Sequence, residues 1–302
     1  MKSLIIQSPA KVNLFLKIVG RRADGYHLLE TLFHRVSLSD TLSLRKTPSG
    51  ISIQTNDPLV PTDRQNLIAK AFELLKKETH ISGGVSVRLT KRIPTAGGMG
   101  GGSSNAAHFL LGMKKLYRLR VSDAKLRKMG SKLGADVNFF LMQTTQAIGG
   151  GIGDKLIARP VAKKLWFVII TMPKPLSTRK VYQTYAKTYG PRFRRPVLPV
   201  SSHFLTKKYP VATLSHYLKD LKEGRKNALL RNDLQEVSAA LYPAVGKALR
   251  LFEELGVETY LVSGSGPTVF GIVPSHTVAS HLAKKIKSTF RPYKQIYIAH
   301  TI

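Results

Sequence analysis

The sequence contains no cysteine, and this absence removes several classes of chemistry at once. Disulfide bonds, zinc–thiolate sites and a cysteine nucleophile are all excluded. Long apolar runs are also missing, since no stretch reaches the length of a membrane span. The opening residues, MKSLIIQSPAKVN, enter a strand-like pattern directly, so we expect no signal or transit peptide. We therefore expect a cytoplasmic protein with no membrane partner.

Acidic residues are scarce in this chain. Lys and Arg number 48 against 17 Asp and Glu, a formal net charge of +31 at pH 7. Such an excess suggests nucleic-acid binding, but it is spread along the chain and no recognised nucleic-acid motif accompanies it. It is densest between Asp154 and Asp233, with a local cluster at Arg192, Arg194 and Arg195. We interpret it as a generally basic surface and expect no nucleic-acid partner; a basic nucleic-acid-binding protein is kept as the alternative.

Glycine, by contrast, is concentrated in the stretch IPTAGGMGGGSSNAA at residues 93–107. Val85, Val87 and Leu89 upstream alternate with polar residues as in a half-buried strand, and the apolar residues downstream recur at helical spacing. A glycine-rich turn between a strand and a helix lets the backbone approach an anion beside unpaired N–H groups. This arrangement predicts a phosphate-binding loop. A flexible linker or a simple tight turn is the alternative, but no polar spacer separates the loop from its flanking elements.

The loop departs from the commonest nucleotide-binding patterns. No Gly-Lys-Ser/Thr closes it, as in a P-loop, and the glycine spacing of the dinucleotide fingerprint is missing. No Asp or Glu lies between Glu78 and Asp123. We therefore expect no dedicated protein ligands for Mg²⁺ here, only the hydroxyl of Ser103 or Ser104 with the phosphates and water.

The order of predicted elements indicates a two-domain α/β (α+β) protein. Residues 4–19 read as a strand interrupted around Ser8 and Pro9, residues 28–33 as strand or a bent connection, and 34–44 and 51–54 as strands. Thr62 or Asp63 is expected to cap the next helix, and another helix, 124–133, opens at Ser122 and stops at Gly134. The pattern changes near residue 160. Strand 166–171, a helix around Val181–Tyr185, helices in about 211–255, strands 259–262 and 268–273, helix 276–289 and strand 295–300 follow the split βαβ order of ferredoxin-like domains.

Three of these segments, in this order, resemble the motifs of the GHMP kinase superfamily. They are SPAKVN at Ser8–Asn13, the glycine stretch from Pro94 to Ser104, and SGSG at Ser263–Gly266. The resemblance is closest to members that act on a cytidine-diphosphate-linked acceptor. It rests on SPAKVNLFLKIVGRRADGYH, GGMGGGSSNAA, LGADVNFF, VSGSGPTVF and the Asn232–Leu234 stretch, which together span nearly the whole chain.

The resemblance implies the two-domain GHMP kinase fold. Residues 1–160 would form the N-terminal domain, like domain 2 of ribosomal protein S5, and residues 161–302 the C-terminal ferredoxin-like domain. It also implies an ATP- and Mg²⁺-dependent kinase that phosphorylates the 2-hydroxyl of a cytidine-diphosphate-linked methylerythritol, on the methylerythritol phosphate route to isoprenoids. A monomer or homodimer is expected. Another GHMP kinase, such as one acting on homoserine or mevalonate, is the nearest alternative.

Site residues are carried over from the resemblance one by one. Asp136 is expected to take the proton from the acceptor hydroxyl, and Lys11 to stabilise that carboxylate and the transferring phosphoryl group. The expected acceptor-binding residues are Asn13, Tyr26 and His27, with Tyr182 as an aromatic partner for cytosine. The expected ATP-binding residues are Asn66 and Lys91, near the adenine, and the phosphate loop: Pro94, Thr95, Ala96, Gly97, Gly98, Met99, Gly100, Gly101, Gly102, Ser103 and Ser104.

Some of these residues have ordinary alternatives, and the sequence departs from the family at several positions. Asp136 could simply cap a helix, and a lone histidine such as His27 is often structural. Asn138 stands where most members have proline, and without that proline the orientation of the Asp136 side chain does not follow from the resemblance. Asn105 stands where many superfamily members carry an acid, which removes one metal ligand. Asp154 replaces a commoner glutamate.

Overall fold

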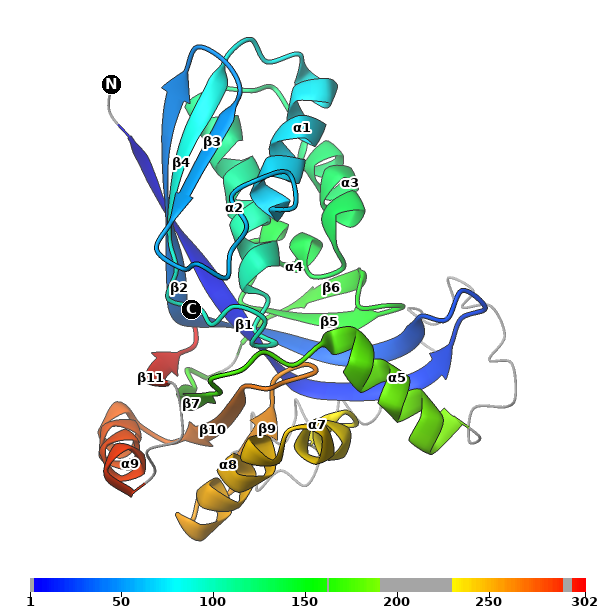
Figure 1. The fold of residues 1–302 in the computed structure, drawn as a ribbon, viewed down its shortest axis with the longest axis vertical. Helices are drawn as coiled ribbons and strands as arrows, with labels where there is room; N and C mark the ends of the chain where they lie inside the picture. Colours follow the sequence, from blue (N-terminus) through cyan, green and yellow to red (C-terminus); the bar gives the residue numbers. More distant parts are fainter. Residues whose placement is uncertain (1–2, 162, 191–229, 290–294) are drawn as a thin grey trace. The chain divides into compact units, whose positions relative to one another are not determined.

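The computed structural model describes residues 3–161, 163–190, 230–289 and 295–302, and Figure 1 shows their fold. The chain divides into two compact units. Unit 1 comprises Met1–Lys11, Leu38–Thr95 and Gly100–Thr144, and unit 2 comprises Val12–Ser37, Ala96–Met99 and Thr145–Ile302. Two long strands, β1 (Leu4–Arg21) and β2 (His27–Thr47), contribute residues to both units. The predicted domain boundary at residue 160 stays a prediction.

Unit 1 packs helices on one face of a sheet, as Figure 1 shows. In this sheet β4 (Gly84–Thr90) lies between β3 (Ile51–Thr55), which is parallel to it, and the antiparallel β2. The helices are α1 (Leu67–Thr79), α2 (Gly101–Leu116), α3 (Asp123–Leu133) and the short α4 (Val137–Leu141). Phe72 of α1 and Phe109 of α2 are buried in its core with the inward residues of β2 and β4. Between β4 and α2 runs the glycine-rich loop, and α2 starts directly after it.

Unit 2 contains an antiparallel sheet with the strand order β11-β7-β10-β9. Its strands are β7 (Trp166–Thr171), β9 (Thr259–Val262), β10 (Val269–Val273) and β11 (Gln295–His300). Helices α8 (Pro243–Glu254) and α9 (His276–Thr289) supply apolar residues to the same core as this sheet. This order confirms the predicted ferredoxin-like arrangement.

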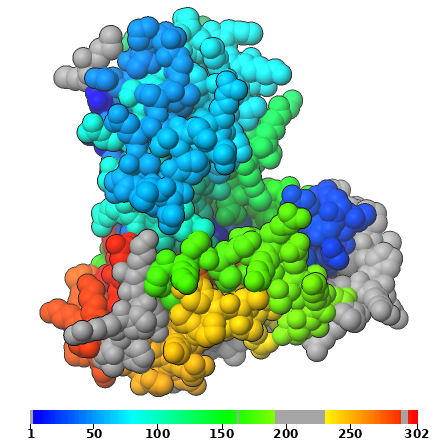
Figure 2. Space-filling view, in the orientation of Figure 1, coloured from blue at the N-terminus to red at the C-terminus, as the bar shows by residue number. Residues whose placement is uncertain are grey.

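Two helices and a short strand of unit 2 pack against the second half of β1. Helix α5 (Thr178–Tyr189) and helix α7 (Gln235–Leu241) share an apolar cluster with Leu16 and Ile18 of β1. Figure 2 shows α5 in green against the yellow atoms of α7, and Tyr189 of α5 donates a hydrogen bond to Glu236 of α7. Short β8 (Arg231–Asn232) pairs in parallel with β1 at Phe15 and Leu16. A hairpin of β5 (Gln146–Gly150) and β6 (Lys155–Arg159), which the sequence did not predict, pairs with β2.

Two local predictions are wrong. Strand β1 runs without interruption through Pro9, because β8 pairs only with Phe15 and Leu16 and leaves one side of β1 without a described strand at Pro9. The cap of α1 is Asn66 rather than Thr62 or Asp63, since the Asn66 side chain accepts from the Ile68 N–H at 2.9 Å. Residues 28–33, left as strand or connection, belong to β2.

Some predictions fall outside the described residues. These are the Arg192, Arg194 and Arg195 cluster and the part of the predicted helices before residue 230. None of the helices in the described ranges combines the length and the apolar composition of a membrane span.

Candidate active site

The glycine loop leads into the N-terminus of α2 in unit 1. Gly100 is the N-cap residue, with a φ of 69°, a left-handed conformation that glycine adopts without penalty. A Cβ at this position would lie 3.2 Å from the Lys11 side chain and 3.1 Å from the Phe140 ring. The backbone at Gly100 is thus packed directly on Lys11. The first N–H groups of a helix have no intrahelical acceptor, so this end of α2 can bind an anion beside a lysine.

Lys11 is buried and forms an ion pair with Asp136. Its Nζ lies 3.5 Å from Asp136 Oδ2, and the side chains are 5% and 30% exposed. Asp136 occupies the N-cap position of α4, yet its side chain makes no capping hydrogen bond. The helix-capping alternative for Asp136 therefore has no support in this geometry. The structure brings together the two predicted catalytic residues and the N-terminus of α2.

The middle of the loop, Ala96–Met99, belongs to unit 2. Ser263 donates to the Gly98 carbonyl oxygen at 3.0 Å, and a Cβ on Gly98 would lie 2.3 Å from the Ser263 carbonyl oxygen. The second and third sequence motifs are therefore in direct contact. Ala96 has a φ of 54°, which is strained for a residue with a Cβ. Met99 is almost fully buried.

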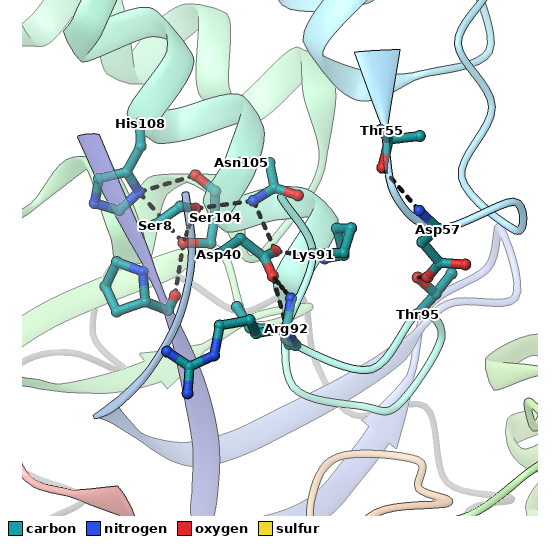
Figure 3. Close-up of polar contacts among 12 residues, drawn as sticks. Ser8, Asp40, Thr55, Asp57, Lys91, Arg92, Thr95, Ser104, Asn105 and His108 are labelled. Carbon is teal, nitrogen blue, oxygen red and sulfur yellow. Dashed lines mark hydrogen bonds and ion pairs between the residues drawn. The ribbon is translucent and has the colours of Figure 1, made fainter. Parts of the chain in front are cut away.

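A network of polar side chains in unit 1 holds both ends of the loop, as Figure 3 shows. The carboxylate of Asp40, which is fully buried, accepts from the Arg92 and Ile93 N–H groups at 2.7 and 2.8 Å and from Asn105 at 2.9 Å. It also pairs with Lys91. No local pattern in the sequence marks Asp40, because its partners come 51 to 65 residues later in the chain.

This network accounts for the burial and the polar partners of the Lys91 and Asn105 side chains. The side chain of Lys91, which was predicted as an adenine neighbour, is only 5% exposed, and its ammonium group forms an ion pair with Asp40. Asn105 is buried and donates to both Ser8 and Asp40. An acid at position 105 would place a second carboxylate against Asp40, so the amide found here fits its surroundings better.

Asp57 holds the start of the loop. Its carboxylate accepts from Thr95 Oγ1 at 2.6 Å (Figure 3). Asn56 binds the backbone of Lys91 through both its amide nitrogen and its oxygen. Asn66, the other predicted adenine neighbour, uses its amide to cap α1 and to donate to the Pro61 carbonyl oxygen. Its side chain is committed to the protein itself.

The prediction that Ser104 could reach a metal is not supported by its position. Ser104 is fully buried, its hydroxyl donates to the Pro9 carbonyl oxygen at 2.6 Å, and Ser8 donates to it. Ser103 is partly exposed and remains the better placed hydroxyl. Among the described residues no group of His, Cys, Asp or Glu is arranged to hold a metal ion.

The predicted acceptor-binding residues lie in unit 2. His27 and Tyr182 are neighbours, with ring centroids 5.2 Å apart, and Tyr185 meets His27 edge-on at 6.2 Å. Burial, with a smaller contribution from the positive charge of Arg21, lowers the pKa of His27 from its ordinary value. The imidazole is therefore held in its neutral form, which offers one donor and one acceptor nitrogen.

Asn13 and Tyr26 differ in exposure. Asn13 is buried and donates to Thr31 Oγ1 at 2.7 Å, whereas Tyr26 is 61% exposed in the turn before β2. Asn232 and Asp233, from the Asn232–Leu234 stretch that carries part of the resemblance, form hydrogen bonds with the protein backbone. Asn232 donates to the Val262 and Gly264 carbonyl oxygens, and Asp233 accepts from the Ile18 N–H. They hold the third motif and β1 in place.

Asn138 occupies the position of the usual proline. Its amide nitrogen donates to Ser131 Oγ at 2.8 Å, while Oδ1 is buried without a partner among the described atoms. The hydrogen bond ties α4 to α3 and therefore helps to fix the residue before α4, Asp136.

Comparison with known proteins identifies the class to which this site belongs. Residues 66–144 match the model of the GHMP kinases N terminal domain, and residues 213–292 match that of the GHMP kinases C terminal. The mevalonate kinase of L. major in complex with R-mevalonate has a similar fold, with a TM-score of 0.72 at 17% identity over 99% of this chain and 97% of that one. The fold and the two matches thus define a GHMP kinase, a class of ATP-dependent enzymes.

More similar proteins narrow the class. A 4-diphosphocytidyl-2-C-methyl-D-erythritol kinase from Geobacter metallireducens is 36% identical over 96% of both chains, and one from Syntrophus aciditrophicus is 38% identical over 89% of both. A crystal structure of 4-(cytidine 5'-diphospho)-2C-methyl-D-erythritol kinase has a TM-score of 0.78 and 30% identity over 98% of both chains. The chain belongs to the 4-diphosphocytidyl-2-C-methyl-D-erythritol kinase family.

Proposed function

We propose that this protein transfers the γ-phosphoryl group of ATP to the 2-hydroxyl of 4-diphosphocytidyl-2-C-methyl-D-erythritol. The reaction would give the 2-phosphate on the methylerythritol phosphate route to isoprenoids. The observation that carries the proposal is the packing of Gly100, the N-cap of α2, on Lys11, whose ammonium pairs with Asp136. Anion-binding backbone, a cation and a carboxylate base are the groups that phosphoryl transfer needs.

Asp136 acts as the base in this proposal. Its carboxylate is partly exposed and not used as a helix cap, so it can accept the proton of an acceptor hydroxyl. Lys11 orients that carboxylate and places a positive charge beside the start of α2, where the transferring phosphoryl oxygens would bind. The free N–H groups of the first turn of α2 hold the phosphates.

The acceptor would be recognised through its cytidine end by unit 2. The neutral His27 can donate to and accept from the polar edge of cytosine, and the Tyr182 ring beside it offers a surface for base stacking. Asn13 is held by Thr31 and Tyr26 is exposed in the adjoining turn. We assign all four to acceptor binding.

Mg²⁺ would enter with ATP. Mg²⁺ in kinases usually keeps several waters and is bound together with substrate phosphates, so the partly exposed Ser103 hydroxyl is the one protein oxygen that we assign to such an ion. When bound, the ion neutralises charge on the phosphate oxygens. The protein's own contribution is to keep this hydroxyl in the first turn of α2.

Product analysis tests the proposal. The protein is mixed with MgATP and the cytidyl-methylerythritol compound, and the products are identified by mass spectrometry and phosphorus NMR. We expect ADP and a monophosphorylated acceptor in equal amounts. Homoserine and mevalonate, offered in place of the cytidyl compound, serve as controls for the alternative kinases. Equal ADP release without the cytidyl compound would mean that the assigned acceptor is wrong.

A further inference from the structure

We propose that Asp40 is a positioning residue of the nucleotide site, which fixes the entrance and the exit of the phosphate loop through one buried carboxylate. The inference rests on the proposed kinase function and extends it to a residue outside every sequence motif. Asp40 lies in β2 and is fully buried, and its carboxylate is hydrogen-bonded to Arg92, Ile93 and Asn105, so it acts through these neighbours.

The entrance of the loop is held by one oxygen of this carboxylate. Asp40 Oδ1 accepts from the backbone N–H of Arg92 at 2.7 Å and of Ile93 at 2.8 Å. Both residues come immediately after β4 and before the glycines. Hydrogen bonds from backbone N–H groups to an ionised carboxylate are among the stronger ones in proteins, so the path of the chain into the loop is fixed here.

The exit is held by the other oxygen. Asp40 Oδ2 accepts from Asn105 Nδ2 at 2.9 Å, and the same Asn105 nitrogen donates to Ser8. Asn105 lies in the early part of α2, the helix whose N-terminal N–H groups bind the phosphates in our proposal. Figure 3 shows Asp40 between the Lys91–Arg92 segment and Asn105. A single carboxyl group therefore sets the spacing between the chain entering the loop and the helix leaving it.

Charge gives a second reason for an acid at this position. Lys91 Nζ lies 3.1 Å from the point where a Cβ on Gly101 would stand, so a buried ammonium sits against the first residue of α2. The N-terminus of a helix carries partial positive charge, and α2 has no acidic residue in its first turn. Asp40 supplies the negative charge that makes this arrangement stable. Without it, the ammonium would have to move, and the start of α2 with it.

Binding measurements on two variants test the inference. Asp40→Asn keeps the shape but turns the oxygen that faces Lys91 and Asn105 into a neutral amide atom. Asn105→Ala removes the hydrogen bond from α2 to Asp40 and leaves the Asp40–Lys91 ion pair intact. We expect the Kd for β,γ-imido-ATP to rise about tenfold or more in Asp40→Asn and by roughly threefold or more in Asn105→Ala. The Kd for cytidine diphosphate should stay within about twofold in both, since its proposed site lies in unit 2. Asp123→Asn, which removes an exposed acid paired with Lys114, is the matched control.

Each outcome decides something different. Thermal melting is recorded for every variant. If Asp40→Asn does not fold, the Kd of Asn105→Ala for β,γ-imido-ATP tests the inference. Unchanged imido-ATP affinity in the folded variants overturns the inference. Equal weakening of imido-ATP and cytidine diphosphate also overturns it, because this would show a general loosening of the protein. A parent protein that binds imido-ATP in an Asp40-dependent way but phosphorylates no cytidyl acceptor would defeat the proposed function alone. A parent that binds no imido-ATP defeats both.

Discussion

Ser263 Oγ donates a 3.0 Å hydrogen bond to the carbonyl oxygen of Gly98, and so joins two glycine-containing motifs that are 165 residues apart in the chain. The contact is close because Gly98 has no side chain: a Cβ there would stand 2.3 Å from the Ser263 carbonyl oxygen and 2.8 Å from that of Gly266. Both neighbours are backbone atoms, which cannot swing aside. The middle of the phosphate loop is therefore shaped by the turn at residues 263–266.

Gly98→Ala is expected to destabilise the protein. The new Cβ would clash with the turn, and the φ of 75° at this position disfavours any side chain. Together these effects should lower the free energy of unfolding by about 2 kcal/mol or more. Gly102→Ala is the matched control, because a Cβ there meets only Leu67 at 3.7 Å. Urea unfolding measures both, and equal stability of the two variants would contradict the tight contact with Ser263.

Asp136→Asn is expected to slow turnover by roughly a hundredfold or more and leave the Kd for β,γ-imido-ATP nearly unchanged. The amide keeps the size of the side chain but cannot take a proton from the acceptor hydroxyl. Since Asp136 makes no capping hydrogen bond, the melting temperature should change little. Steady-state rates, nucleotide titration and melting are the measurements. Full activity in the variant would remove Asp136 from the mechanism.

Ser104→Ala is expected to act on stability and not on the metal. The buried hydroxyl bonds to Ser8 and to the Pro9 carbonyl oxygen, so its loss should cost about 1–3 kcal/mol of unfolding free energy. The Mg²⁺ concentration for half-maximal rate should be that of the parent. In Ser103→Ala, whose hydroxyl is partly exposed, that concentration should rise. The reverse pattern in the two variants would make Ser104 the metal-facing hydroxyl.

Tyr182→Ala is expected to weaken acceptor binding selectively. Loss of a stacking surface commonly costs about 1–3 kcal/mol per base, so the KM for the cytidyl acceptor should rise roughly tenfold while the KM for ATP is unchanged. Tyr182→Phe keeps the ring and should behave nearly as the parent. Initial rates at varied acceptor and varied ATP separate the two effects. If the Phe variant loses as much affinity as the Ala variant, the hydroxyl and not the ring binds the acceptor.

His34 should make the protein less stable as the pH falls below neutrality. Gln146 Nε2 donates to Nδ1 of this buried ring, which leaves Nε2 to donate to Thr301 Oγ1, so both nitrogens are used by the neutral form. Burial lowers the pKa of His34 from 6.5 to about 3. Between these values the unfolded chain binds a proton that the folded one does not. Stability therefore falls with decreasing pH, by up to about 1.4 kcal/mol per pH unit for this residue.

Urea unfolding at pH 7, 6 and 5 measures that dependence. His34→Gln should reduce the loss of unfolding free energy between pH 7 and pH 5 relative to the parent. His276→Gln, at an exposed position on α9, should retain the parental dependence. An identical pH dependence in His34→Gln and the parent would show that another group causes the acid sensitivity.

The features that depend on near neighbours in the chain could be predicted from the sequence alone. The glycine loop between β4 and α2, the Ser122 cap and Gly134 end of α3, and the ferredoxin-like strand order all follow from local patterns, and the structure confirms them. Caps, turns and hydrophobic periodicity are decided over a few residues, so they can be read from one sequence. The continuity of β1 through Pro9 could not be predicted in this way, because it depends on where β8 stops pairing with β1.

Which side chains meet at the loop depends on contacts between distant parts of the chain, and these became visible only in the folded protein. The sequence around the glycines is free of acids, yet Asp40 and Asp57 from earlier strands and turns, and Asp136 from after α3, supply carboxylates in unit 1. The same folding turned Ser104 inward and committed Lys91 to Asp40. A buried charge has to find its partner wherever the fold places it, and no periodicity in the sequence records a contact between residues 51 positions apart.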